Sequence, residues 1–387
     1  MLKSITWKDF CSFSFFIIIN LAILIQFSQL GDSASGKTII SGLLAVSLIP
    51  LIFQYFFIGT LRRKDLIFIL FLVIVSILYF ANLGNFTVLK IFLCVLATKG
   101  LTIKKVITYN TLTMAIVFLL IVLSSFIGIT SIYYSGILFK WDAVQTAYVF
   151  GFNNPNTPPS IIFVLLSGYN LLHKKIKLWV IVVEVLIAIL TFNFFLSRTG
   201  VGAIVGYSLL ILLIQHIDHF KLGKYLLKPF QCSFLLMSIL SCYSAIAFSI
   251  TDVFWNGVNL LLSGRLYLWK SWIDFAGISV FGSSIPYELD ALDNGYLYML
   301  IIYGAFMLLF YNYVFLRVFR VAFQSKNWIL FATAIMYSVY AFCEKGPLLY
   351  SMCNILLIFG TLIMNGQEKR TSNDNTKSEY TVNNNNT

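Results

Sequence analysis

Residues 178–214, LWVIVVEVLIAILTFNFFLSRTGVGAIVGYSLLILLI, consist of two apolar runs joined by a short polar turn. Each run is long enough to cross roughly 30 Å of hydrocarbon as a helix, so we expect spans at 178–196 and 200–216. Arg198 lies in the turn between them. An arginine at such a junction must lie near a membrane surface, because its charge is costly to bury in hydrocarbon.

The same pattern recurs along nearly the whole chain. The 387 residues are 59% hydrophobic and 11% charged, with a mean hydropathy of +0.87. This composition is too apolar for a soluble globular protein, and the absence of strand-like alternation favours helices. We therefore expect an all-α integral membrane protein with about twelve transmembrane helices. The expected spans are 10–30, 39–59, 66–83, 85–99, 107–129, 156–172, 178–196, 200–216, 231–251, 294–316, 327–343 and 347–365.

The basic residues predict the orientation of these spans. With both termini in the cytoplasm, all but seven of the 27 Lys and Arg residues fall on the cytoplasmic side, as the positive-inside rule requires. The protein is then a multi-pass protein of the cell membrane. Because the basic residues lie between spans, the net charge of +12 does not indicate nucleic-acid binding. The seven outward residues are Lys37, Lys90, Lys140, Arg198, Arg265, Lys270 and Lys345.

The domain organisation follows from the same pattern. Residues 1–366 form one polytopic membrane domain, and the polar, Asn-rich residues 367–387 form a disordered cytoplasmic tail. Two outward segments are long enough to carry function. One is 130–155, and the other is the large loop 252–293 between spans nine and ten, which we expect to contribute to an active site. The six cysteines fall in or beside apolar runs without a CxxC pair, so neither a metal site nor a disulfide is expected.

Two outward arginines suggest an anion site. Arg198 follows Ser197 at the start of span eight, where a helix N-terminus can receive an anion. Arg265, Trp269 and Trp272 share one face of an amphipathic helix, which we expect to lie on the outer surface with its tryptophans at the headgroup level. Forked cations suit phosphate or pyrophosphate. The alternative is that each arginine only reaches out to lipid headgroups.

An outward base must be an aspartate or a glutamate, because all three histidines map to the cytoplasmic side. Asp290 and Asp293 precede span ten, and Glu344 lies in the outer turn before the last span. Carboxylates beside apolar surface can have raised pKa values and act as general bases. The alternative for Asp293 is an N-cap of the helix that begins near Asn294.

Several short motifs occur together in this chain: GFNNPN at 151–156, LSRTG, then SGR followed by tryptophans and FGSS, and finally LDNGYLYMLIIYG. In this order they resemble the Wzy-type polysaccharide polymerases and O-antigen ligases, over roughly residues 140–365. The resemblance implies action on undecaprenyl-pyrophosphate-linked oligosaccharides at the outer face of the cytoplasmic membrane. It implies that Arg198 and Arg265 hold the pyrophosphate. Asp293 stands where the ligases commonly have a histidine, which disfavours the ligase interpretation.

The expected function is therefore a membrane glycosyltransferase that polymerises oligosaccharide repeat units, with lipid pyrophosphate as leaving group and without a cofactor or metal. A ligase that moves glycan to another acceptor, and a lipid-linked oligosaccharide flippase, are the alternatives. The sequence leaves open whether a chain-length regulator binds, and whether the product is capsule, exopolysaccharide or O-antigen. The candidate catalytic residues are Asp293, Asp290 and Glu344, and the candidate substrate-binding residues are Arg198, Arg265, Lys270, Ser197, Asn294, Tyr296, Trp269, Asn153 and Asn156.

Overall fold

The computed structural model describes residues 6–58, 63–84, 86–136, 138–140, 143–217, 223–283 and 292–365. Within these ranges most of the chain is helical. The helices are α1 (Trp7–Gln26), α2 (Ala34–Phe53), α3 (Arg63–Leu83), α4 (Thr87–Leu96), α5 (Ile103–Phe126), α6 (Thr157–Leu171), α7 (Leu178–Phe195), α8 (Arg198–Ile214), α9 (Gly223–Leu227), α10 (Ser233–Ala247), α11 (Val253–Leu261), α12 (Arg265–Ala276), α13 (Gly295–Ile302), α14 (Gly304–Gln324), α15 (Trp328–Ala341) and α16 (Asn354–Asn365). A small antiparallel hairpin pairs β1 (Leu138–Lys140) with β2 (Ala143–Gln145).

Polar residues fix where several of these helices begin. A side-chain oxygen just before the first turn accepts a hydrogen bond from an amide that has no partner inside the helix. At α1 the cap is reciprocal, because Thr6 and Asp9 each bond the other's backbone amide. The other side-chain N-caps are Ser33 for α2, Thr102 for α5, Ser197 for α8, Asp252 for α11, Asn294 for α13 and Asn327 for α15.

Seven of the described helices are long and apolar enough to cross a membrane, judged by length and composition. This is compatible with the expected α-helical membrane protein. Each of the twelve expected ranges contains a helix, but α4, α8, α15 and α16 are shorter apolar helices, so the count of twelve spans stays a prediction. The seven segments are Trp7–Gln26, Ala34–Phe56, Asp65–Leu83, Ile103–Phe126, Leu178–Phe195, Tyr225–Ala247 and Gly304–Gln324.

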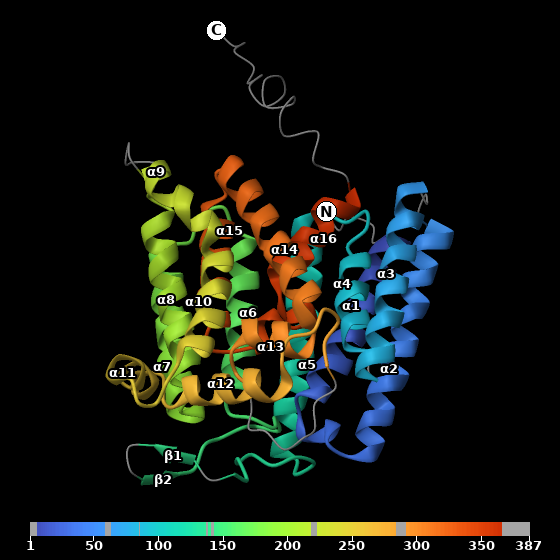
Figure 1. The fold of residues 1–387 in the computed structure, drawn as a ribbon. Helices are drawn as coiled ribbons and strands as arrows, with labels where there is room; N and C mark the ends of the chain where they lie inside the picture. The colour runs from blue at the N-terminus through green and yellow to red at the C-terminus, as the bar shows by residue number, and fades with distance from the viewer. Residues whose placement is uncertain are drawn as a thin grey trace.

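The helices stand side by side as a bundle with two distinct ends (Figure 1). One end carries α11, α12 and the β-hairpin, and we call it the loop end. The start of α1 and the end of α16 lie at the opposite end, where the Asn365 side chain accepts a hydrogen bond from the Gly100 amide at 2.6 Å. The two ends of the described chain thus lie on the same side of the bundle. Which side faces the cytoplasm stays a prediction, and the predicted tail 367–387 lies outside the described residues.

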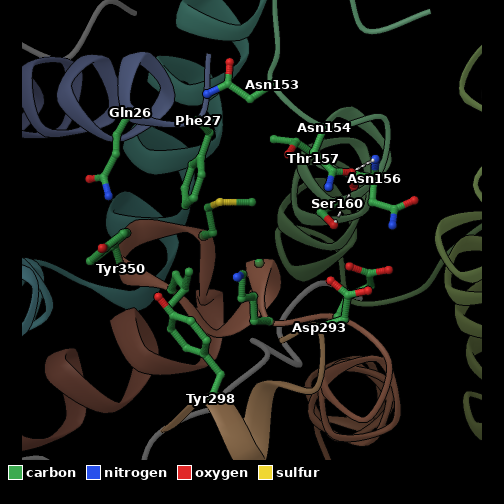
Figure 2. A pocket seen from close by; sticks show the side chains of 15 residues that line it. Gln26, Phe27, Asn153, Asn154, Asn156, Thr157, Ser160, Asp293, Tyr298 and Tyr350 are labelled. Atoms are coloured by element: carbon green, nitrogen blue, oxygen red, sulfur yellow. Dashed lines mark hydrogen bonds between the residues drawn. The ribbon is translucent and has the colours of Figure 1, made fainter. Parts of the chain in front are cut away.

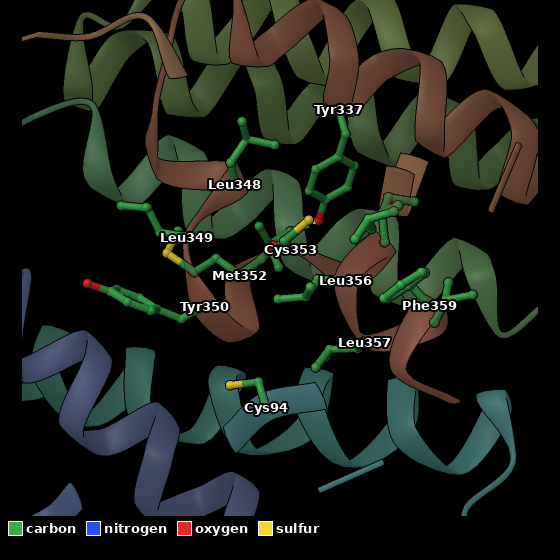
Figure 3. Packing of buried hydrophobic residues seen from close by; sticks show 14 of the residues in the cluster. Cys94, Tyr337, Leu348, Leu349, Tyr350, Met352, Cys353, Leu356, Leu357 and Phe359 are labelled. Carbon is green, nitrogen blue, oxygen red and sulfur yellow. Dashed lines mark hydrogen bonds between the residues drawn. The ribbon is translucent and has the colours of Figure 1, made fainter. Parts of the chain in front are cut away.

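The buried core is centred on α15 and α16, which are covered on nearly all sides. Between them the chain makes two 3₁₀ turns, Gly346–Leu348 and Tyr350–Met352. Figure 3 shows Cys353 and Leu356 packed among the side chains of this cluster. Tyr337 spans the gap by donating its hydroxyl to the Met352 carbonyl at 3.0 Å. The turn between α15 and α16 is therefore buried inside the protein.

Helix α12 corrects one expectation. The face that carries Leu266, Trp269 and Trp272 is buried, with Trp269 only 1% exposed. Trp269 packs edge-to-face on Phe342 with ring centroids 5.1 Å apart, in an apolar cluster shared with α10 and α13. The expected headgroup anchoring by tryptophan is therefore wrong. The apolar face of α12 packs on the protein because α10 and α13 offer it a protein surface.

The expected span 294–316 is also corrected, because it is broken into α13 and α14 at Gly304, whose φ is +80°. The amides of Ala305 and Phe306 donate to the carbonyls of Ser279 and Val280 at 2.9 and 3.1 Å. The segment before α13 thus supplies acceptors for the first turn of α14. A side chain at position 304 would meet this backbone, so the break requires glycine.

Candidate functional site

A cavity of about 260 Å³ opens near the loop end. Its lining comes from four places in the chain: the end of α1, the Asn-rich stretch before α6, the start of α13 and the turn after α15. Figure 2 shows Asp293 on one side, with Gln26 and Tyr350 on the other. The residues that the site uses below are Gln26, Asn153, Asn156, Asp293, Tyr298, Glu344, Lys345 and Tyr350.

Three charged side chains from distant parts of the sequence meet beside this cavity. Arg265 Nη2, at the start of α12, lies 3.4 Å from Glu344 Oε1 and 3.5 Å from Asp293 Oδ2. The other terminal nitrogen of the guanidinium donates to the carbonyl of Cys343. Asp293 and Glu344 line the cavity, whereas Arg265 lies behind them. The structure therefore brings together two of the predicted catalytic residues and one predicted binding residue.

The LSRTG turn reaches the same cluster, through a residue that the sequence did not single out. The hydroxyl of Thr199 donates to Glu344 Oε1 at 2.9 Å. Ser197 is buried and caps α8 by accepting from the Gly200 amide at 3.3 Å. Arg198 is exposed and does not line the cavity. Thr199 was missed because a threonine in the first turn of a helix carries no signal of a partner 145 positions away.

Burial sets the electrostatics of the two carboxylates. Glu344 is 5% exposed, and burial together with the nearby Asp293 charge raises its pKa to about 7, against the opposing effects of Arg265 and Thr199. Burial likewise raises the pKa of Asp293, and the charges of Arg265 and Lys345 oppose the shift. Because the two acids interact, they titrate as a pair. Such a pair can hold or release a proton near neutral pH.

Asp293 does not cap the following helix, so the capping interpretation of this residue is wrong. Asn294 does so instead, and its side-chain oxygen accepts from the amides of Tyr296 and Leu297, both at 3.0 Å. Its amide nitrogen donates to Ser241 Oγ at 3.0 Å and to the Phe342 carbonyl at 3.1 Å. Asn294 is fully buried and fully bonded. Asn294 therefore stabilises the start of α13, whereas the Asp293 carboxylate faces Arg265.

The Asn-rich stretch before α6 contributes amide groups to the cavity lining. Asn153 and Asn156 both line the cavity, and their role in substrate binding stays a prediction. The Asn153 amide nitrogen donates to Asp32 Oδ1 at 2.9 Å. Its oxygen is buried and has no hydrogen-bond partner among the described residues. A buried acceptor without a partner is costly, and a ligand hydroxyl in the cavity can satisfy it.

The remaining predicted binding residues do not line the cavity. Tyr296 is fully buried and donates its hydroxyl to the Ser338 carbonyl at 2.6 Å, and Trp269 packs on Phe342. Lys270 lies on the outer side of α12, where its Nζ is 3.4 Å from Asp274 Oδ2. Tyr296 and Trp269 shape the wall behind the site. The predicted catalytic residue Asp290 lies outside the described residues.

Within the described part of the chain, no group of three His, Cys, Asp or Glu side chains could hold a metal ion. No family model, no curated protein and no solved structure matches this chain. The resemblance drawn from the short motifs therefore stays an expectation. The chemistry of the cavity has to support the function by itself.

Proposed function

We propose that the protein is a polysaccharide polymerase, which joins lipid-pyrophosphate-linked oligosaccharide repeat units at the loop end of the bundle. The observation that carries the proposal is the buried carboxylate of Glu344, which lines the cavity and contacts Arg265 and Thr199. A buried carboxylate with a perturbed pKa in a cavity is a candidate general base.

In the proposed reaction, Glu344 takes the proton from the acceptor sugar hydroxyl. The freed oxygen forms a new bond to the anomeric carbon of the donor, and the bond from that carbon to the pyrophosphate oxygen breaks. A pKa of about 7 suits Glu344 for this role, because a base is most effective when its pKa lies near the working pH. The pyrophosphate is already a good leaving group, so the donor carries its own activation.

Arg265 is best assigned to positioning. It faces both Glu344 and Asp293 at ion-pair distance and is also bonded to the Cys343 carbonyl. Two nearby carboxylates balance its charge and would repel an approaching phosphate. This assignment differs from the pyrophosphate grip that the resemblance implies. Arg265 instead keeps the two acids in one orientation and limits their pKa values.

The rest of the lining suits a sugar. Asn153 and Asn156 offer amide groups to sugar hydroxyls, and the aromatic rings of Tyr298 and Tyr350 line other parts of the cavity. Sites of this kind combine apolar walls with a few placed polar groups that fix orientation. The cavity opens at one end of a bundle of apolar helices, which is where a membrane-bound donor and a water-exposed acceptor would meet.

The test is the lipid-linked glycan profile of cells that lack this protein, complemented with wild type, with Glu344→Gln or with Lys37→Gln. Lys37 is an exposed residue of α2 that does not line the cavity, so Lys37→Gln is the matched control. Single repeat units stalled on lipid at the outer face, in the null and Glu344→Gln cells only, support the polymerase.

Two other outcomes would contradict the proposal. Long chains left on the lipid would indicate a ligase, and repeats trapped on the cytoplasmic face would indicate a flippase. Loss of a general base typically lowers a rate by about 10²- to 10⁴-fold, so a normal profile in Glu344→Gln cells would also remove Glu344 from the reaction.

A further inference from the structure

The cavity has two electrically different walls. On one side Asp293 and Glu344 present carboxylates. On the other, Tyr298 and Tyr350 lie together with Gln26 (Figure 2). Each of these two tyrosines carries a lysine against its ring, so the second wall is backed by positive charge.

The first of these lysines is Lys90 in α4, which is only 6% exposed. Its ammonium donates to Gln26 Oε1 at 2.5 Å and lies 5.3 Å from the centre of the Tyr350 ring. Both contacted residues line the cavity. An ammonium has three donors, and burial of such a charge is costly without an opposite charge.

The second is Lys345, next to Glu344 in the turn after α15. Its Nζ lies 4.5 Å from the centre of the Tyr298 ring, and Lys345 itself lines the cavity. Among the described residues, no carboxylate lies within ion-pair distance of Lys90 or Lys345. In this they differ from the basic residues that do form ion pairs, namely Lys99, Lys105, Arg265 and Lys270.

We infer that the cavity binds the anionic group of its ligand against Lys345, that the Lys90 ammonium behind Gln26 and Tyr350 adds positive charge to the same region, and that Arg265 is not the anion's main partner. Interpreting this anion as part of the substrate rests on the proposed function. A negative charge that develops on a departing group is then met by cations already in place.

Two sources share this anion chemistry: a lipid phosphate and an acidic sugar. A second, apolar cleft of about 170 Å³ lies between α2 and α4, lined by Leu44, Leu48 and Leu89, and it also reaches Lys90. A hydrocarbon chain in that cleft would place its phosphate at Lys90. An acidic sugar would use the cavity beside Glu344 alone. The two lysines suit either anion. Only a lipid phosphate would also place a hydrocarbon chain in the apolar cleft.

The experiment measures binding by the full-length protein, purified in detergent, with isothermal titration calorimetry. The probes are farnesyl diphosphate, inorganic pyrophosphate and glucuronic acid. We expect Lys345→Gln to weaken anion binding about tenfold or more, because it removes a charge-assisted contact. Lys90→Gln should weaken binding less, because the ammonium lies behind Gln26 and Tyr350, and Lys37→Gln should leave it unchanged. Farnesyl diphosphate that binds more tightly than pyrophosphate identifies a lipid phosphate. Glucuronic acid as the tightest probe identifies an acidic sugar.

Binding of all probes that survives both lysine substitutions would overturn the inference.

The binding measurement needs no glycosyl transfer, so it fails separately from the proposed function. If binding does not depend on the lysines but repeats stall in Glu344→Gln cells, the polymerase proposal is supported and the role of the lysines is contradicted. If binding depends on the lysines but the glycan profile of those cells is normal, the role of the lysines is supported and the polymerase proposal is contradicted.

Discussion

Thr199 donates a hydrogen bond to Glu344 Oε1 at 2.9 Å, and this contact ties the first turn of α8 to the turn after α15. The same carboxylate oxygen lies 3.4 Å from Arg265 Nη2 at the start of α12. Three helix ends therefore converge on one buried oxygen. The position and the protonation of Glu344 depend on all three.

We expect Thr199→Val to raise the pKa of Glu344 further, because the hydroxyl stabilises the charged carboxylate. A base with a higher pKa needs a higher pH to be deprotonated, so the rising limb of the pH–rate profile should move to higher pH. Thr199→Ser keeps a hydroxyl and should restore the profile. Glycan assembly by purified membranes, measured across pH, checks both. Identical profiles for the valine and serine variants would show that the hydroxyl does not act on Glu344.

The stability of the protein should fall as the pH rises through neutrality. The pKa of Glu344 is about 7 in the folded protein against an ordinary value of 4.5, so between these values the folded state binds more protons than the unfolded state. Raising the pH from about 5 to about 8 then favours unfolding. We expect the thermal midpoint of wild type in detergent to fall over this range, and that of Glu344→Gln to fall less. An equal slope in both would assign the dependence to other groups.

Arg265→Ala should destabilise the protein through the two acids that it leaves behind. Breaking a buried ion pair by removing one partner costs about 3 kcal/mol or more. Neutralising one acid in addition, as Arg265→Ala/Glu344→Gln, should recover part of the loss, so the two substitutions will not be additive. Thermal unfolding of the single and double variants measures this coupling. Lys270→Ala is the control, since its exposed pair with Asp274 contributes at most about 1 kcal/mol.

The sequence predicted several of these features and missed others for identifiable reasons. Hydropathy located the helices, and the placement of charged residues near one end identified Arg265, Asp293 and Glu344 separately. Their contact depends on how α12 packs, and no local pattern encodes that. The inward packing of Trp269 was missed for the same reason. An amphipathic helix has one apolar face, and the sequence does not say whether lipid or protein covers it.

The break within the expected span 294–316 was missed because hydropathy does not show where the amides of a helical turn donate to carbonyls outside the helix. Gly304→Ala should destabilise the protein by more than about 1 kcal/mol, because residue 304 has a positive φ. A Cβ there would also lie 2.4 Å from the Gly282 amide nitrogen. Gly42→Ala is the matched control, because nothing lies within 4 Å of its Cβ position on α2. Thermal midpoints compare the two, and equal midpoints would contradict this role of Gly304.

Asn294 and Asp293 should respond to substitution in opposite ways. Asn294→Ala removes the cap of α13 and the bonds to Ser241 and Phe342, so we expect a loss of about 1–3 kcal/mol in stability. Asp293→Asn removes a charge beside Arg265 but no cap, and should lower glycan assembly more than stability. Thermal unfolding and the glycan profile of both variants test this division. A stable Asn294→Ala protein would contradict it.

This division has a consequence for how the gene can vary. Variants substituted at position 294 should differ in the amount of protein that reaches the membrane. Variants substituted at position 293 should differ in the amount of glycan product, while the amount of protein stays constant. Selection for folding would then act on residue 294, and selection for the reaction would act on its neighbour, residue 293. Natural variants that retune the reaction would be drawn from position 293, with asparagine kept beside it.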